Sequence, residues 1–500
     1  MIRSTTRPET TRTVATFASL ITLLACGGAE SGRDPNAAPT YGGRLAPTSP
    51  NTPAGPDSPD GMPLGSTPGE STQGEIPLNG TPPGGLGAPP VMTPPSTEMP
   101  SAPQPVPPTG LPGVGSVEDS GAACPRPALP PANQLTPFAT HSDPFLMADG
   151  TRITTKAQWT CRRAEIKAQV EEYESGPKPA VDKANVSGQL NGNQLTVGVS
   201  EAGRNVSFSI TINRPDDAPT GPIPLLIGVG GSSLDNSVFS QNGVATANLD
   251  NNGMGAQAGG GSRGTGTFFD LYGNTHAASS MVAWAWGISR VIDALESTPA
   301  ANIDPRRVAV TGCSRNGKGA LTAGAFDERI VLTIPQESGA GGSASWRVAQ
   351  VQSSQGENVQ TLSSAAGEQP WFRANFGQNF GGNNVTRLPF DHHTVMGMVA
   401  PRALLVIDNQ IDWLGIDSTF TAGSIANQIW QAFGLADHMG YWQTTGHTHC
   451  AFPAAQRAIL DAYVKKFLVG GGTDDTSVLR GDAAQADLDQ WLQWTPPVLE

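Results

Sequence analysis

The stretch from Val308 to Gly319, with the sequence VAVTGCSRNGKG, most constrains how this chain can fold. A β-branched run ends abruptly at Gly312, and residues 315–326 can start and continue a helix. We therefore predict a strand, a tight turn that holds Ser314, and a helix whose N-terminus points at the serine hydroxyl. Free backbone N–H groups and the helix dipole can stabilise an oxyanion at such a turn. The usual motif is Gly-x-Ser-x-Gly, but here the second glycine comes one residue later. A glycine-rich turn with an incidental serine is therefore the alternative.

Apolar runs alternate with helical patterns from residue 123 to the end of the chain. We predict buried strands at residues 223–231, 244–249, 307–311, 330–334, 403–407 and 441–445, and helices at 159–173, 281–296, 315–326, 421–433 and 454–468. Strands and helices that alternate at these lengths favour an α/β fold with a doubly wound, mostly parallel sheet.

Two further segments depart from this alternation. Residues 194–200 and 205–213 alternate between apolar and polar residues, which predicts an antiparallel pair at the start of the domain. Residues 251–267 are rich in glycine and are predicted to form an irregular surface loop.

The first 26 residues have the pattern of an export signal. They carry Arg3, Arg7 and Arg12, followed by an apolar run that ends in Leu-Leu-Ala-Cys26. This run of about 12 residues is too short for a membrane core that needs roughly 20. A small residue before Cys26 resembles a lipobox, so Cys26 is the candidate lipidated N-terminus of an outer-membrane or cell-surface lipoprotein of a bacterium. The alternative is ordinary secretion, with Cys26 removed.

Residues 27–122 are rich in proline, glycine, serine and threonine and contain few large apolar side chains. Such a segment cannot bury enough surface to offset its ordering entropy, so we predict an extended linker before a folded domain at residues 123–500. The whole chain has a formal net charge of −13. Because no basic cluster accompanies this charge, the composition argues against nucleic acid as a partner.

The five cysteines of the chain bear on both folding and chemistry. If Cys26 is lipidated, the other four suffice for two disulfides in an oxidising compartment: Cys124, Cys161, Cys313 and Cys450. A cysteine-based metal site is the alternative, but the sequence has no CxxC pair.

A serine nucleophile needs a histidine base, and the base needs an acid to orient it. His447 and His449 lie between the last predicted strand and the last helix, where α/β hydrolases place their base. If Cys450 were bonded to Cys313, His449 would be tied beside Ser314 and favoured over His447. His392 and His393 form a second pair, which suits hydrogen bonding that anchors a loop.

Three carboxylates are candidates for the orienting acid. Glu337 follows the strand after the nucleophile helix, whereas Asp408 and Asp412 follow a later strand, the more usual position in this fold. The residues leave this choice open. Gly230 and Gly231, after another buried strand, are candidate oxyanion donors.

Five separated motifs, in one order, closely resemble the glucuronoyl esterases, a carbohydrate esterase family of α/β-hydrolase fold. They are GCSRNGKG from Gly312, ESGAGG from Glu337, GEQPW from Gly367, IDWLG from Ile411 and HCAFP from His449. The resemblance runs from about Cys124 to Leu499 and implies a three-layer αβα sandwich with a twisted central sheet.

By this resemblance the nucleophile is Ser314, the base is His449 and the acid is Glu337. The acid position of some bacterial members falls at Ile411, which cannot serve. The resemblance also implies the disulfides of fungal members, although a third fungal bridge has no cysteines here. The implied bridges are Cys313–Cys450 and Cys124–Cys161.

The resemblance further implies that Arg315 completes the oxyanion site and that Lys318, Gln360, Glu368 and Trp413 bind the glucuronoyl sugar. It implies a monomeric enzyme without a metal or organic cofactor. The expected substrates are esters between (4-O-methyl-)glucuronic acid of glucuronoxylan and lignin-type alcohols. Two alternatives are an acetyl xylan esterase of the same fold and a non-catalytic glycan-binding protein at the cell surface.

Overall fold

Seven parallel strands form the central sheet of the computed structural model, which describes residues 117–201 and 203–500. Every neighbouring pair in this sheet is parallel, so the predicted parallel sheet is confirmed. Across the sheet the strands are β10 (Leu479–Gly481), β9 (Met439–Thr444), β8 (Ala403–Asn409), β7 (Ile330–Gln336), β6 (Ile303–Cys313), β4 (Ile223–Val229) and β5 (Ala245–Leu249).

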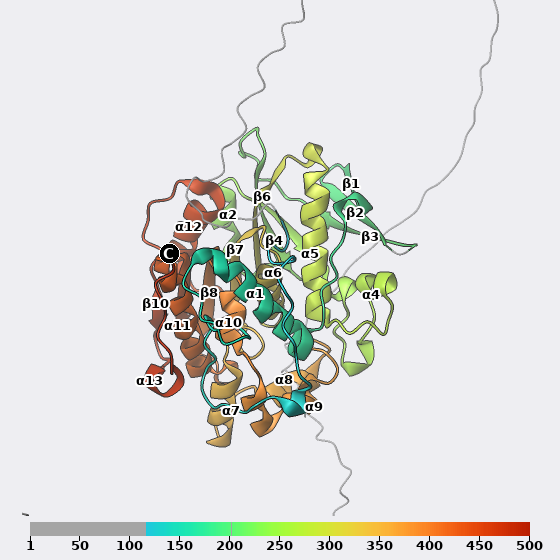
Figure 1. Cartoon of the computed structure of the whole chain (residues 1–500). Helices are drawn as coiled ribbons and strands as arrows, with labels where there is room; N and C mark the ends of the chain where they lie inside the picture. The colour runs from blue at the N-terminus through green and yellow to red at the C-terminus, as the bar shows by residue number, and fades with distance from the viewer. Residues whose placement is uncertain (1–116, 202) are drawn as a thin grey trace, which may run out of the picture. The chain divides into compact units, whose positions relative to one another are not determined.

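The strands bury side chains on both faces, because successive residues point to opposite sides of a sheet. In β6, Val308 and Val310 belong to one apolar core and Ala309 to the other. The first core is shared with α1 (Lys156–Val170), α5 (Ser280–Glu296), α6 (Arg315–Phe326), α10 (His392–Gly397) and α11 (Ile416–Ala432). The second is shared with α2 (Asn236–Gln241), α12 (Arg457–Tyr463) and the π-helix Val464–Gly470. Helices therefore cover both faces, and the predicted three-layer α/β-hydrolase fold is confirmed (Figure 1).

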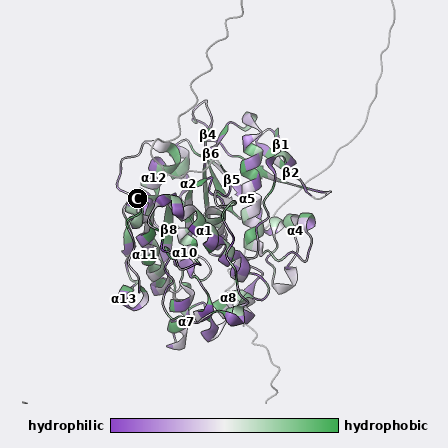
Figure 2. Cartoon of the chain, viewed as in Figure 1, coloured by the Kyte–Doolittle hydropathy of each residue, from purple (hydrophilic) through white to green (hydrophobic). Residues whose placement is uncertain are grey.

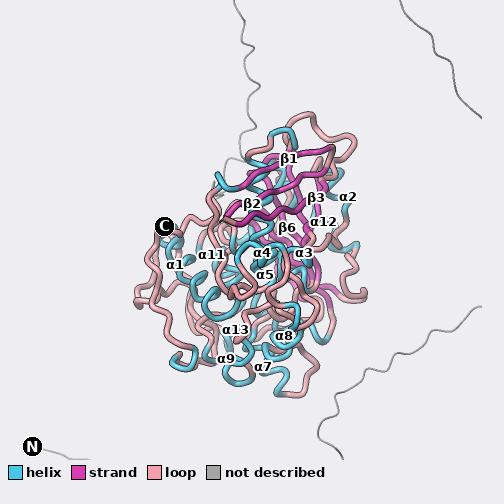
Figure 3. The backbone as a smooth tube through the Cα atoms, turned by 90° about the vertical axis from the view of Figure 1, so that its right-hand side faces the viewer, coloured by secondary structure: helices cyan, strands magenta, loops and turns pink. Residues whose placement is uncertain are grey.

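A second sheet has three antiparallel strands, β1 (Val186–Asn191), β2 (Gln194–Glu201) and β3 (Arg204–Thr211). The alternating runs predicted β2 and β3 correctly but missed β1. The small sheet packs on α5, where an added Cβ at Gly188 would lie 2.8 Å from the carbonyl oxygen of Ala294. Figure 3 shows β1, β2 and β3 side by side in the upper part of the view, above helices α4 and α5.

Several short helices lie in regions that the sequence pattern left irregular. They are α3 (Asn251–Met254), α4 (Thr267–Tyr272), α7 (Trp346–Ser354), α8 (Leu362–Glu368), α9 (Phe376–Phe380) and α13 (Leu488–Trp491). The prediction of an entirely irregular loop at residues 251–267 was thus partly wrong. Figure 2 shows hydrophilic and hydrophobic residues interleaved on α7 and α13, as expected of helices with one buried side.

The described chain begins with residues that contact the folded domain. Glu118 forms ion pairs with Lys178 and Arg290, and the N–H of Ser120 donates to Glu328 at 2.7 Å. The predicted export signal with Cys26, and the linker as far as residue 116, lie outside the described residues. Among the described residues, we find no helix with the length and apolar character that a membrane crossing requires.

Candidate active site

Ser314 occupies the sharp turn between β6 and α6. Its backbone has φ 60° and ψ −128°, a conformation that is rare for a residue with a side chain, and its N–H donates to the carbonyl of Gln336 at 2.9 Å. The turn requires glycine at two positions. An added Cβ would lie 2.5 Å from the Asn316 carbonyl oxygen at Gly312 and 2.6 Å from the Gln336 carbonyl oxygen at Gly317. The displaced second glycine of the motif is therefore explained by close packing against β7.

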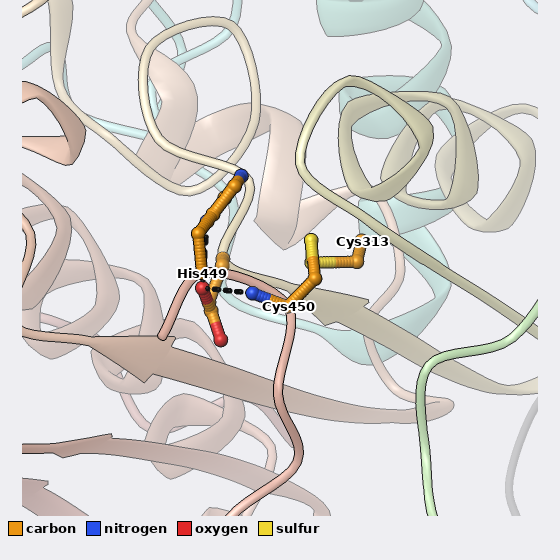
Figure 4. Close-up of side chains that lie close together, drawn as sticks. Cys313, His449 and Cys450 are labelled. Atoms are coloured by element: carbon orange, nitrogen blue, oxygen red, sulfur yellow. Dashed lines mark hydrogen bonds and ion pairs between the residues drawn. A yellow bond between two sulfur atoms is a disulfide. The ribbon is translucent and has the colours of Figure 1, made fainter. Parts of the chain in front are cut away.

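Glu337 and His449 form a hydrogen-bonded pair at the same edge of the sheet. Nδ1 of His449 lies 2.7 Å from Oε2 of Glu337, which also accepts the backbone N–H of Cys450 at 2.8 Å. Glu337 is fully buried, whereas the side chain of His449 is 28% exposed. Figure 4 shows His449 beside Cys450 and the disulfide that leads to Cys313.

Burial alone would raise the pKa of Glu337. The hydrogen bonds from His449 and from the N–H of Cys450 outweigh burial and hold the pKa of this carboxyl below its usual value. Weaker contacts come from the side-chain amides of Gln336 at 3.4 Å and Asn409 at 3.5 Å. The carboxylate is thus kept ionised, as a group that orients a histidine must be.

The described residues contain two disulfides, Cys313–Cys450 and Cys124–Cys161, which are the pairings that the resemblance implied. The first joins the residue before Ser314 to the residue after His449. The sulfurs of Cys313 and Cys450 also lie close to Glu337 and His449, in a group that could otherwise hold a metal ion. Because the two sulfurs are bonded to each other, neither can act as a thiolate ligand.

A cavity of about 560 Å³ opens beside Ser314 and His449. Nε2 of His449 is buried and has no hydrogen-bond partner among the described residues. The free nitrogen suits proton exchange with a group inside the cavity. The other residues that line it are Arg315, Lys318, Asn358, Val359, Gln360, Ser364, Glu368, Trp371 and Trp413.

Polar groups hold one another in place along this cavity. Nζ of Lys318 donates to the carbonyl of Ser338 at 2.5 Å, and Nε2 of Gln360 donates to Glu368 at 2.7 Å. The ring of Trp413 meets the ring of His449 edge-on, with centroids 4.7 Å apart. Burial lowers the pKa of Lys318 to about 7. The four predicted sugar-binding residues therefore line the same cavity as Ser314, and so does Arg315.

Asp408 and Asp412 were the other candidate acids. Asp408 is buried and accepts from the hydroxyl of Tyr441 at 2.9 Å, and burial raises its pKa to about 6. It has no hydrogen bond or ion pair to a histidine among the described residues, and the side chain of Asp412 lies outside them. In the described part of the chain, Glu337 is the carboxylate that His449 contacts.

The other candidate histidines have different partners. His447 bonds to the hydroxyl of Thr444 at 2.9 Å and lies 3.8 Å from Glu337, outside the cavity lining. His392 contacts Glu174 at 3.1 Å, and His393 contacts the carbonyl of Ser142 at 2.9 Å. Both are buried, in agreement with a loop-anchoring role.

The expectation for Gly230 and Gly231 is not met, since neither lines the cavity. The N–H of Gly230 donates to the carbonyl of Leu249 at 3.0 Å, so it is engaged within the sheet. Conversely, four residues that line the cavity were not predicted as such: Asn358, Val359, Ser364 and Trp371. Only their position close to Gln360 and Glu368 could have indicated them.

The site has the arrangement of an α/β hydrolase. A serine lies at a strand-to-helix turn of the sheet, beside a histidine that a buried carboxylate orients.

Comparisons with known proteins show which family of α/β hydrolases the chain resembles. Residues 197–434 match the family model described as glucuronyl esterase, fungi. The 4-O-methyl-glucuronoyl methylesterase of Hypocrea jecorina is 48% identical over 379 residues, which cover 76% of this chain and 80% of the relative. That of Podospora anserina is 45% identical over 381 residues, or 74% and 76% of the two chains.

Solved structures agree with these relatives. The glucuronoyl esterase catalytic domain from Hypocrea jecorina matches with a TM-score of 0.71 and 48% identity, over 74% of this chain and 100% of that chain. A serine-to-alanine variant of the Sporotrichum thermophile enzyme, in complex with methyl 4-O-methyl-beta-D-glucopyranuronate, matches with a TM-score of 0.71 and 41% identity, over 75% and 100%. The chain belongs to the glucuronoyl esterase family and is a carboxylic ester hydrolase.

Proposed function

We propose that this enzyme cleaves the ester between (4-O-methyl-)glucuronic acid of glucuronoxylan and a lignin-type alcohol, with Ser314 as nucleophile. The observation that carries the proposal is the 2.7 Å contact between His449 Nδ1 and Glu337, at a cavity that Ser314 also lines. The names of the relatives and the uronate ester bound to the Sporotrichum thermophile variant support the substrate class.

In the first half of the reaction, Oγ of Ser314 attacks the uronoyl carbonyl carbon. Its proton passes to Nε2 of His449, while the ionised Glu337 stabilises the imidazolium that forms. The tetrahedral intermediate then collapses, the ester C–O bond breaks, and the alcohol leaves with the proton from Nε2. The glucuronoyl group remains esterified to Ser314.

In the second half, water attacks the glucuronoyl carbonyl and gives a proton to His449. The bond to Oγ of Ser314 breaks, the serine regains its proton, and free glucuronate is released. Each half of the reaction passes through a tetrahedral intermediate, which carries negative charge on the former carbonyl oxygen. The N–H of Arg315, in the first turn of α6, has no acceptor within the helix and is a donor for this oxyanion. The guanidinium of Arg315 adds positive charge nearby.

The sugar is held from the acyl side of the ester. Lys318, Gln360 and Glu368 offer donors and acceptors for hydroxyl groups, and Trp413 offers a flat apolar wall. A site of this kind binds an acyl group that carries several hydroxyls. An acetyl ester presents its sugar on the alcohol side and cannot make the same contacts.

We further propose that the enzyme is exported and acts as a monomer, anchored through a lipid on Cys26 or secreted. Its two disulfides support an oxidising compartment. The proposal of a lipid anchor is based on the residue pattern before Cys26.

The substrate assignment is tested with two esters of similar size. Benzyl glucuronate carries its sugar on the acyl side, and an acetylated xyloside carries it on the alcohol side. We expect kcat/KM for benzyl glucuronate to exceed that for the acetylated xyloside by at least about 100-fold, the order of magnitude that one charge-assisted hydrogen bond can supply. Equal values for the two esters would contradict the proposal, as would a preference for the acetyl ester.

A further inference from the structure

The glycine-rich loop, residues 255–266, docks against residues 369–372, which directly follow Glu368. Three hydrogen bonds cross this junction. Gln257 Oε1 accepts from Trp371 Nε1 at 2.8 Å, Gly259 N–H donates to Gln369 Oε1 at 2.6 Å, and Arg263 Nη1 donates to the Phe372 carbonyl at 2.8 Å. The loop therefore forms an outer support for one wall of the cavity.

Helix α5 anchors both partners of this junction. The hydroxyl of Ser280 donates to the carbonyl of Ala256 at 2.7 Å, and its N–H donates to the carbonyl of Pro370 at 2.9 Å. The indole N–H of Trp284 donates to the carbonyl of Gly255 at 2.8 Å. The position of the loop relative to Trp371 is thus fixed by the core rather than by the junction alone.

Trp371 depends on Gln257 for its ring orientation. The side chain is 3% exposed, and its indole nitrogen can only donate a hydrogen bond. A ring flip would carry this N–H away from Gln257 and leave a buried donor without its partner, which is costly. The acceptor at Gln257 therefore selects one orientation of the ring.

The ring of Trp371 in turn contacts the lysine of the cavity. Nζ of Lys318 lies 5.7 Å from the centroid of the Trp371 ring, within the range of a cation–π interaction. The carbonyl of Ser338 holds the same ammonium from another side at 2.5 Å. The Trp371 ring and the Ser338 carbonyl therefore both hold Nζ of Lys318, and together they determine where its remaining N–H donors point.

We propose that Gln257 is a positioning residue for substrate recognition, which acts through Trp371 to aim the Lys318 ammonium at the glucuronoyl sugar. The inference rests on the proposed function, because it assigns Lys318 to the sugar. Gln257 touches no reacting atom in this scheme. Its effect falls on binding of the uronate and not on the bond-breaking step.

The test is a double-mutant cycle with Gln257→Leu and Trp371→Phe. Gln257→Leu removes the acceptor at similar side-chain volume, and Trp371→Phe removes the indole N–H but keeps an aromatic ring. We expect each single variant to raise KM for benzyl glucuronate about two- to tenfold, the range for one neutral hydrogen bond, with kcat little changed. The double variant should be no worse than Trp371→Phe alone. Gln257→Leu, which lies outside the cavity lining, should leave hydrolysis of a simple aryl acetate unaffected, because this ester has no sugar on the acyl side.

A direct binding measurement accompanies the kinetics. Calorimetry of the Ser314→Ala variant, with and without Gln257→Leu, gives Kd for methyl 4-O-methyl-glucuronate without turnover. The same two- to tenfold weakening is expected. Unchanged Kd and KM would overturn the inference, and so would equal damage to both substrates or a full further loss in the Trp371→Phe background. Failure of the proposed function is distinguishable, because the unmodified enzyme would then not prefer benzyl glucuronate at all.

Discussion

Cys313 and Cys450 are 137 residues apart in the sequence and are joined by a disulfide, with each cysteine directly beside a proposed catalytic residue. The bridge connects the turn of Ser314 to the loop of His449. Glu337 accepts the N–H of Cys450, so the three proposed catalytic residues are linked through one short covalent and hydrogen-bonded path. Ser314, Glu337 and Cys450 all have positive φ, and this strained backbone depends on the structure around it.

Replacing both Cys313 and Cys450 by serine should lower stability and activity together. We expect a loss of about 2–5 kcal/mol in the free energy of unfolding, the range for native disulfides, measured by denaturant titration. The matched control is the double serine variant of Cys124 and Cys161, which should lose stability but retain kcat. An equal fall in kcat for both variants would contradict a positioning role for Cys313–Cys450.

Glu337→Gln should retain the fold and lose most turnover. The neutral amide cannot stabilise the imidazolium of His449 and can favour its wrong tautomer, so kcat should fall by roughly 10³–10⁴-fold on both uronate and acetate esters. Asp408→Asn is the matched control at the other candidate position and should cost less than about tenfold. If Asp408→Asn were the more damaging change, Glu337 would not be the acid.

Binding of the uronate should weaken as the pH rises through about 7, the pKa to which burial lowers Lys318. The ammonium is charged below this pH and neutral above it. Glu368 and Asp408 attract the charge and Arg315 repels it. Calorimetry of the Ser314→Ala variant with methyl 4-O-methyl-glucuronate between pH 6.5 and 8.5 should show a rising Kd. Adding Lys318→Met should weaken binding about tenfold to hundredfold at pH 6.5 and remove the slope. A slope that survives in Lys318→Met would assign it to another group.

The sequence predicted the elements whose local pattern is unambiguous. Residues 308–319 gave the strand, turn and helix around Ser314, because the β-branched run and the spaced glycines allow little else. The acid could not be chosen from spacing, since Glu337 directly follows β7 and Asp408 lies at the end of β8, its neighbour in the sheet. They are distinguished by their contacts with His449, whose Nδ1 lies 2.7 Å from Oε2 of Glu337. The resemblance to a family, rather than the residue pattern, favoured Glu337.

Other features depend on contacts that no local pattern encodes. Strand β1 was missed because Gly188 interrupts the apolar-polar alternation of its sequence, VSGQLN, and its pairing with β2 is not visible in that sequence. The hydrogen bond between Gln257 and Trp371 joins residues 114 positions apart. The loop that contains Gln257 is rich in glycine, and its sequence predicts only irregular structure. Residues 118–120 have the composition of the predicted linker, yet Glu118 forms ion pairs with the buried side chains of Lys178 and Arg290.

Glu118→Gln should destabilise the domain, although Glu118 is not one of the residues that line the cavity. It forms ion pairs with Lys178 and Arg290, whose side chains are buried, and its removal leaves their charges less compensated. We expect a loss of about 3 kcal/mol in urea denaturation, with KM unchanged. The control is Asp461→Asn, which breaks a partly exposed i,i+4 pair with Lys465 and should cost about 0–1 kcal/mol. Similar losses in the two variants would show that the contacts of Glu118 are unimportant to the fold.

In the proposed mechanism, Ser314 carries the glucuronoyl group during turnover. Acid-quenched reaction mixtures with benzyl glucuronate, digested and analysed by mass spectrometry, test it directly. We predict a glucuronoyl ester on the peptide that contains Ser314, and neither the ester nor turnover in Ser314→Ala. A glucuronoyl adduct on another residue, or hydrolysis of benzyl glucuronate by Ser314→Ala at the rate of the unmodified enzyme, would contradict the mechanism.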